Sequence, residues 1–290
     1  MMIIDPYRFG SLTPNLCGTG AIAPLGWEYL HSEISGGLGS WGNMIKVEGF
    51  NSKGATVENV TDGSLDVCYK DGEIDKSALD SFFTANADVK DQYDQFGLND
   101  LNDGSINSEY NKSANDLNKG GSHKISSFSG SLSSLKNSDS WTICIVIDSI
   151  DTPTVNQLFN PISFGTSDLQ AIWSGNNTSL ILRFGGPNQG YFYNGLRSSG
   201  TKLLIITYDG TSPINRSGLN LYWNGSTTAE TPAGSYNSGA PASNQVLAEV
   251  ALRNWRGDSY AKELDIFDSA FGSTEILAAK SAYEQLYTFS

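Results

Sequence analysis

Residues 203–210 read LLIITYDG, and residues 219–225 read LNLYWNG. Each is a short run rich in Ile, Leu, Tyr and Trp, a composition typical of buried β-strands. The first run ends in Asp209-Gly210 and the second in Asn224-Gly225, dipeptides that favour tight turns because they tolerate positive φ angles. The two stretches therefore predict neighbouring strands joined by tight connections.

The same pattern continues through the second half of the chain. Four further apolar runs predict strands, at residues 141–147, 180–184, 246–252 and 261–267. One closing helix is predicted, with Ser273 as its N-cap and Ile276, Ala279, Tyr283 and Leu286 on one face. Only 17% of the residues are charged and 31 are Gly, which argues against long helical bundles. We therefore expect a mainly β protein built on an antiparallel β-sandwich.

The first half gives weaker signals. Short strands are expected at 44–47, 55–57 and 65–69, followed by a short helix with Asp75 as N-cap and an apolar face of Leu79, Phe82 and Phe83. Residues 1 to about 40 indicate an arm that orders on a partner. Residues 99–122, rich in Asn, Ser, Gly and Asp, are expected to form a long loop.

Net charge and cysteine usage argue against several classes of partner and site. The net charge of −13 disfavours nucleic acid as a partner, because phosphate binding needs clustered Lys and Arg. Three Cys residues, at 17, 68 and 144, argue by their odd number and spacing against a disulfide framework or a zinc site. Cys144 lies in an apolar run and is expected to be buried. We expect assembly in a reducing cytosol, without a signal peptide or a membrane span.

Two stretches resemble known families. The series LLIITYDG, LNLYWNG and AKELDIFDSAFGSTEI (residues 261–276) resembles the concanavalin A-like and laminin G-like jelly roll, a resemblance that implies a fold and says little about function. Residues 45–102, with IKVEGFNSKGATVENV and YDQFGLND, resemble a module that precedes jelly rolls in bacteriophage virion proteins. A relative of that module occurs in fungal α-L-arabinofuranosidases. Here Gln92 and Phe96 replace the Trp and Ser of the usual WYDQSGNG motif.

These resemblances imply two parts and a location. Residues 1–84 would form an attachment arm with a small α+β module, and residues 85–290 would form the jelly roll. The expected protein is a non-enzymatic virion protein, in a tail fibre, spike or surface position, that binds other virion proteins through its N-terminal segment. It would be a homo-oligomer, for which a trimer is a guess. The alternatives are a capsid decoration protein and a glycoside hydrolase or polysaccharide lyase of jelly-roll fold.

Catalytic residues are not evident in the sequence. A glycoside hydrolase needs two carboxylates across a cleft, about 5–5.5 Å apart for retention and roughly 6.5–9.5 Å for inversion. Glu263 and Asp265 lie two residues apart on one strand face, so we interpret them, like Glu249, as solvated side chains. His31 and His123 are interpreted as surface residues. Asn and Asp clusters at 99–103 can bind Ca²⁺, but Asx-turns explain them more simply, and no cofactor is expected.

Aromatic and amide side chains suggest a glycan surface instead. Sugars bind to aromatic faces and to planar amides or carboxylates, and three short stretches offer both. The candidate residues for binding a host glycan are Trp173, Asn176, Tyr191, Tyr193, Asn194, Arg253 and Trp255. The alternative for each is a place in the core, because alternation along a strand turns some of these rings inward.

Overall fold

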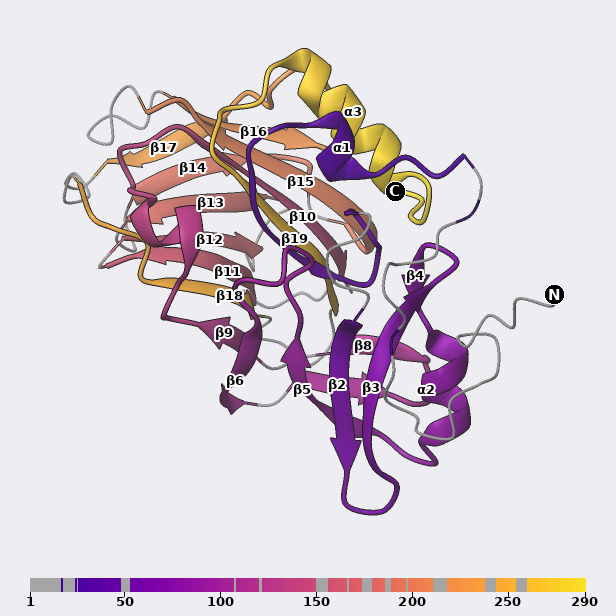
Figure 1. Cartoon of the computed structure of the whole chain (residues 1–290). Coiled ribbons are helices and arrows are strands. Elements are labelled where there is room, and N and C mark those ends of the chain that lie inside the picture. The colour runs from indigo at the N-terminus through magenta and orange to yellow at the C-terminus, as the bar shows by residue number, and fades with distance from the viewer. Residues whose placement is uncertain are drawn as a thin grey trace, which may run out of the picture.

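The computed structural model describes most of the chain (Figure 1). The described residues are 17, 24, 26–47, 53–106, 108–119, 122–149, 156–165, 167–173, 179–185, 189–196, 198–210, 218–237, 244–253 and 260–290. Every strand pairing among them is antiparallel. The expected mainly β fold is thus confirmed, with two stacked layers and a smaller sheet beside them.

The first layer of the sandwich contains the stretches that predicted the fold. Its strands, in spatial order, are β1 (Gly37–Gly42), β19 (Tyr260–Phe267), β10 (Trp141–Ser149), β15 (Gly200–Tyr208) and β16 (Leu219–Trp223). Alternation divides β10 between two environments. Ile143, Ile145 and Ile147 face the second layer, whereas Cys144 and Val146 face the C-terminal helix.

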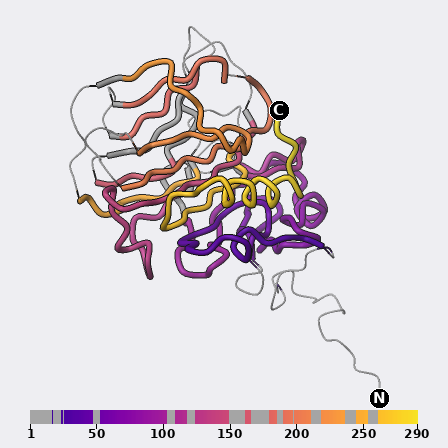
Figure 2. Tube along the Cα trace, turned by 90° about the horizontal axis from the view of Figure 1, so that it is seen from above, coloured from indigo at the N-terminus to yellow at the C-terminus, as the bar shows by residue number. Residues whose placement is uncertain are grey.

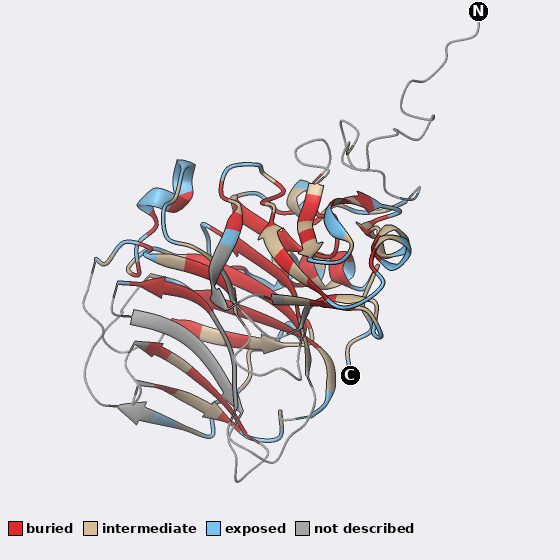
Figure 3. Cartoon of the chain, turned by 90° about the horizontal axis from the view of Figure 1, so that it is seen from below, coloured by how far each residue is buried: buried red, intermediate tan, exposed pale blue. Residues whose placement is uncertain are grey.

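The second layer packs against these isoleucines. Its strands, in order, are β6 (Leu101–Ile106), β9 (Ser122–Ile125), β18 (Glu249–Arg253), β11 (Asn156–Phe164), β12 (Ser167–Trp173), β13 (Leu180–Gly185), β14 (Gln189–Tyr193) and β17 (Gly234–Asn237). Figure 3 shows buried residues along the strands and exposed residues mainly at turns and on helix surfaces. The main core therefore lies between the two layers, around Trp141, Phe164 and Phe184.

Two helices cover the outer side of the first layer. Helix α3 (Ser273–Tyr283) buries Ile276, Ala279 and Tyr283 against it, as the sequence predicted. The N-cap is Gly272 rather than Ser273, and Glu275 accepts a hydrogen bond from its backbone N–H at 3.0 Å. The short α1 (Leu30–Glu33) lies beside α3 (Figures 1 and 2). None of the helices in the described ranges is long and apolar enough to cross a membrane.

A third group of strands, here called the small sheet, has the order β3, β2, β5, β7, β8. Their bounds are β3 Gly63–Lys70, β2 Lys53–Asn59, β5 Ala87–Gln92, β7 Ser108–Asn111 and β8 Asp116–Lys119. The two-residue β4 (Glu73–Ile74) pairs with β3, and α2 (Lys76–Phe82) covers one face. Asp75 caps α2 as predicted, because its Oδ1 accepts a hydrogen bond from Ala78 N at 3.0 Å.

Several expectations about the first half are wrong. Residues 99–122 contain β6, β7, β8 and the start of β9 rather than one long loop, since their polar residues occupy a sheet with one solvated face. Residues 30–42 are not an arm, because they form α1 and a strand of the first layer. The predicted boundary after residue 84 falls within the small sheet, where β2 pairs with β5. The division into an attachment part, residues 1–84, and a jelly roll, residues 85–290, stays a prediction.

The cysteines also differ from expectation. Cys17 and Cys68 form a disulfide across 51 positions of sequence, and only the fold brings them together. The odd count misled because the third residue, Cys144, is a buried free thiol, as predicted. Structural disulfides persist in oxidising compartments, so the argument for a reducing cytosol no longer holds.

Candidate functional site

The outer face of the small sheet carries a row of acidic side chains. Along β2 and β5, alternation turns Val57 and Val89 into the core under α2. The intervening residues Glu58 and Asp88 therefore point to the opposite, solvated face. Their side chains are 46% and 50% exposed, which is enough to meet a ligand from solution.

Strand register extends this row across neighbouring strands. Glu58 lies opposite Asp88, and Asp88 lies opposite Glu109 on β7. Directly opposite residues in antiparallel sheets have Cβ atoms about 4.5–5.5 Å apart. Three carboxylates thus stand side by side on one face, with Asp88 in the middle.

Lys90 partly neutralises the negative charge of this acidic row. Its Nζ lies 3.2 Å from Glu58 Oε1 and 3.6 Å from Asp88 Oδ2. All three side chains are partly exposed, so these ion pairs contribute little to folding stability. Their effect is local, because the hydrogen bonds and charges of Glu58 and Asp88 outweigh desolvation and raise the pKa of Lys90.

A cavity of about 640 Å³ opens over this row. It falls in the size range of small-molecule sites. Besides the three acids and Lys90, it is lined by Asn59, Val60, Gly63, Ser64, Asn86 and Ala87. Carboxylates, amides and a hydroxyl provide the donors and acceptors that sugar hydroxyls require. The cavity can therefore hold a polar, hydroxyl-rich ligand against adjacent carboxylates.

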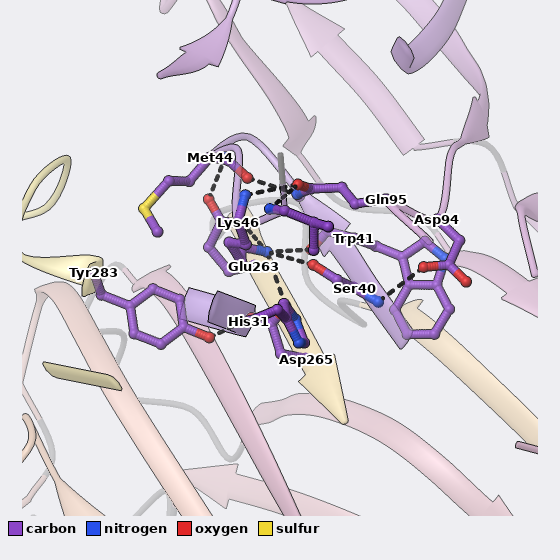
Figure 4. Close-up of polar contacts among 12 residues, drawn as sticks. His31, Ser40, Trp41, Met44, Lys46, Asp94, Gln95, Glu263, Asp265 and Tyr283 are labelled. Atoms are coloured by element: carbon purple, nitrogen blue, oxygen red, sulfur yellow. Dashed lines mark hydrogen bonds and ion pairs between the residues drawn. The ribbon is translucent and has the colours of Figure 1, made fainter. Parts of the chain in front are cut away.

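A second cluster of charged groups lies inside the molecule, under α1 and α3 (Figure 4). Glu263 and Asp265 on β19 share the ammonium of Lys46, at 2.7 Å and 3.2 Å. Tyr287 donates a hydrogen bond to Glu263, and Tyr283 donates one to Asp265. Both carboxylates are completely buried, so the interpretation of them as solvated strand residues is wrong. The helix and the N-terminal segment cover the strand face that we expected to meet water.

Backbone geometry fits this cluster closely. Gly42 has φ 146°, and a Cβ there would collide with the carboxylate of Glu263 and with the carbonyl of Lys262. Met44 N donates to Glu263 Oε1 at 2.8 Å. Residues 44–47, expected as a strand, instead form an extended loop (the 44–47 loop), whose backbone bonds go largely to side chains and to the turn at Gly72.

The Tyr-Asp-Gln motif at the end of β5 secures the same loop. Gln95 Oε1 accepts hydrogen bonds from Lys46 N at 2.6 Å and Val47 N at 3.2 Å, while Gln95 Nε2 donates to Met44 O at 2.7 Å. Asp94 Oδ1 accepts from Ser40 N at 3.0 Å. Burial raises the pKa of Asp94 to about 7. The motif that resembled a phage module therefore has a structural use here, which is to join β5 to the N-terminal segment.

The buried acids differ in their protonation. Burial raises the pKa of Glu263 to about 7, although Lys46 opposes the shift. Burial acts in the same direction on Asp265, but Lys46, His31 and Tyr283 outweigh it and lower the pKa of Asp265. A pair with diverging pKa values is typical of catalytic acids. Complete burial nevertheless keeps substrate away, so we assign this cluster to the architecture rather than to hydrolysis.

The other acidic and His residues considered in the sequence analysis are Glu249, His31 and His123. Glu249 Oε2 lies 3.3 Å from Lys124 Nζ on the neighbouring strand and is partly exposed. His31, expected at the surface, is buried between the rings of Phe96 and Phe267. The side chain of His123 lies outside the described residues. No group of three or more His, Cys, Asp or Glu in the described part of the chain could hold a metal ion.

The predicted glycan-binding residues do not gather into one described surface. Tyr193 is 2% exposed and belongs to the main core, so its ring cannot stack on a sugar. Tyr191 packs against the same core and is partly exposed, whereas Asn194 is exposed and accepts a hydrogen bond from Ser179 at 2.7 Å. Asn176, Trp255 and the side chains of Trp173 and Arg253 lie outside the described residues. A glycan-binding role for these four, and for Tyr191 and Asn194, stays a prediction.

Sequence reasoning missed Glu58, Asp88 and Glu109. The alternation in residues 55–59 and 87–90 places Glu58 and Asp88 on solvated faces, and it is visible in the sequence. What the sequence does not show is the register that makes them neighbours. Glu109 was hidden further, because it lies in the stretch that we expected to be a loop.

Known structures share this fold. A GH54 α-L-arabinofuranosidase soaked with a cyclic sulfate inhibitor superposes with a TM-score of 0.55 at 12% identity, over 84% of this chain and 61% of that chain. A mutant GH54 α-L-arabinofuranosidase soaked with 4-nitrophenyl α-L-arabinofuranoside gives 0.54 at 11% identity, with the same coverage. An arabinofuranosidase complexed with arabinofuranosyl-α-1,2-xylobiose gives 0.50 at 11% identity, over 87% of this chain and 64% of that chain.

These comparisons establish the fold, and this chain spans less than two thirds of each of those proteins. No protein-family model matches the chain, and no curated protein sequence matches it. The expectation of a non-enzymatic protein is contradicted, because the three structures described above, which share the fold over 84–87% of the chain, are arabinofuranosidases. That expectation also assumed that the fold brings no carboxylates together at an accessible place. The small sheet does bring three carboxylates together, at the cavity. The chain is thus a β-sandwich protein similar in fold to arabinofuranosidases.

Proposed function

We propose that this protein is a glycoside hydrolase that acts on arabinofuranosides or similar sugars. Two findings support the proposal: the similarity in fold to arabinofuranosidases over 84% of the chain, and an open cavity lined by three adjacent carboxylates. The cavity is the observation that carries it, because hydrolysis of a glycosidic bond needs two carboxyl groups within reach of one sugar.

The three acids of the row would have separate roles in hydrolysis. Asp88 stands between the other two acids, with Lys90 Nζ 3.6 Å from its Oδ2, so Asp88 would attack the anomeric carbon with departure of the leaving group. Glu109, opposite Asp88, would protonate the leaving oxygen in that step and then accept a proton from the water that releases the sugar. Glu58, held by Lys90, would accept hydrogen bonds from sugar hydroxyls. This assignment follows from register and charge in the described residues.

The test is hydrolysis of 4-nitrophenyl α-L-arabinofuranoside and of arabinofuranosyl-xylobiose by the intact chain. Asp88→Asn and Glu109→Gln are each expected to lower kcat/KM by at least about 100-fold, the usual contribution of a nucleophile or a general acid. Glu284→Gln is the matched control, because Glu284 is 49% exposed and pairs with Lys280 at 3.7 Å, much as Glu58 pairs with Lys90. If Asp88→Asn and Glu109→Gln both retain hydrolysis, the cavity is not the active site. If the wild type does not hydrolyse either substrate, the proposed function is wrong.

A further inference from the structure

The buried cluster under α1 and α3 joins parts of the chain that lie far apart in sequence. Lys46 comes from the 44–47 loop, His31 from α1, and Tyr283 and Tyr287 from α3 and the segment that follows it. Each of them contacts Glu263 or Asp265 on β19, and Figure 4 shows Lys46, His31 and Tyr283 gathered around these acids. The two acids therefore hold the N-terminal segment and the C-terminal helix against the first layer.

The charges of this cluster do not balance when both acids are ionised. Two carboxylates then share one ammonium, which leaves one net negative charge in a region with no exposure. An uncompensated charge in the interior is costly, and one bound proton removes it. The geometry thus favours a state that carries one extra proton.

The surroundings place this proton on Glu263. The His31 ring stacks on Phe267 at 4.9 Å and meets the edge of Phe96 at 4.7 Å, an apolar environment that disfavours the imidazolium. Asp265 contacts His31 Nε2 at 3.5 Å besides Lys46 and Tyr283, and Glu263 contacts Met44 N at 2.8 Å besides Lys46 and Tyr287. Because an Asp carboxyl is intrinsically the stronger acid, the one proton that the pair retains resides on Glu263. Glu263 Oε1 contacts the hydroxyl of Tyr287, and a hydroxyl can accept a hydrogen bond as well as donate one.

Other titratable groups that face the cluster come from every element packed around it. They are Tyr69 on β3, Glu73 on β4, Asp94 after β5, Cys144 on β10 and Lys262 on β19. Tyr69 donates its hydrogen to Gly42 O at 2.7 Å, and burial raises the pKa of both Tyr69 and Cys144. Lys262 pairs with Asp116 instead of Glu263. Apart from Lys46, no charged group of the described chain contacts Glu263 as an ion pair.

We propose that Glu263 is a buried proton-binding site that clamps α3 and residues 26–47 to the first layer while it holds a proton, and that loosens both when the proton leaves. This clamp also affects the small sheet, because Gln95 fastens the 44–47 loop to the end of β5. Proton loss is therefore expected to loosen the attachment of the strand that carries Asp88 and Lys90. The inference does not depend on the proposed hydrolase function.

The direction of the effect follows from linkage. The pKa of Glu263 is raised from 4.5 to about 7, mainly by burial. Its contribution to stability is complete below pH 4.5 and is lost as the pH rises through about 7. His31 acts in the opposite direction, since burial lowers its pKa and the folded state resists its protonation below pH 6.5. A test must therefore isolate Glu263.

The primary test is the ¹³C NMR titration of the Glu263 side-chain carboxyl in the intact wild-type protein. We expect a midpoint near neutral pH, and a carboxyl that is ionised throughout pH 5–9 would overturn the proposal. This measurement needs no variant, so it remains decisive if a substituted chain does not fold.

The second test is hydrogen exchange of the segments that the clamp holds. Between pH 6 and 8.5, the opening of α3 and residues 26–47 should increase about 10-fold after correction for intrinsic rates. Glu263→Gln should abolish most of this increase, whereas Glu249→Gln, which removes a partly exposed acid on β18, should retain it. An equal increase in wild type and Glu263→Gln would refute the clamp.

Discussion

Asp88 on β5 stands directly opposite Glu109 on β7, with their side chains on the solvated face of the small sheet. Eight of the ten residues around the cavity come from strands β2, β3, β5 and β7 themselves, so its floor is held by a hydrogen-bonded sheet. Rigid elements of this kind position reacting groups more accurately than loops do. The relation between these two acids leads to a sharper test of their roles.

Glu109→Gln should distinguish substrates by their leaving groups. A 4-nitrophenolate leaves without help from an acid, whereas a sugar alkoxide needs a proton. We therefore expect Glu109→Gln to lose at least about 10-fold more kcat/KM on arabinofuranosyl-xylobiose than on the nitrophenyl substrate. Asp88→Asn should impair both substrates equally. Equal losses on both substrates in Glu109→Gln would contradict its role as the acid.

Lys46→Met should destabilise the fold strongly. Its removal leaves the buried Glu263–Asp265 pair without its cation, for which the expected loss is about 3–5 kcal/mol of unfolding free energy. Lys53→Met provides the comparison, because Lys53 also pairs with an acid at 2.7 Å but is 30% exposed. That change should cost less than about 1 kcal/mol. Chemical denaturation at pH 7 measures both, and similar losses would mean that burial of the ion pair contributes nothing.

The sequence predicted the sandwich because its strands are long, apolar and separated by clear turn signals. The same reasoning failed for residues 101–119, where polar strands lie in a sheet with one solvated face and resemble a loop in composition. Glu263 and Asp265 illustrate a second limit. Alternation correctly put them on one face of β19, but only the packing of α3 and residues 26–47 decides whether that face meets water. The acid row was out of reach for a third reason, since it depends on register between three strands.

Glu263→Gln should change the pH dependence of thermal stability. In the wild type, Glu263 takes up a proton on folding between pH 4.5 and about 7, so its contribution falls as the pH rises through that range. The Gln side chain of the variant cannot ionise, so the variant does not lose this contribution to stability as the pH rises. Measured from pH 5 to pH 8, the Tm difference between variant and wild type should shift in favour of the variant. A constant difference would show that Glu263 does not titrate in this range.

Loss of the Cys17–Cys68 disulfide should destabilise the protein about as much as loss of Lys46. The bond joins residues 51 positions apart and fastens the chain before α1 to β3. For a loop of this length, the expected cost is about 4 kcal/mol, chiefly through greater freedom of the unfolded chain. Cys17→Ser should lower the unfolding free energy by this amount in oxidising buffer, and a reductant should then have no further effect on the variant. Wild-type protein in reductant should have the same unfolding free energy as the variant, because both then lack the bond. In the variant, Cys68 has no replacement partner, because Cys144 is buried. If the reductant leaves wild-type stability unchanged while free thiol titration rises by two, the bond forms but contributes nothing to the fold.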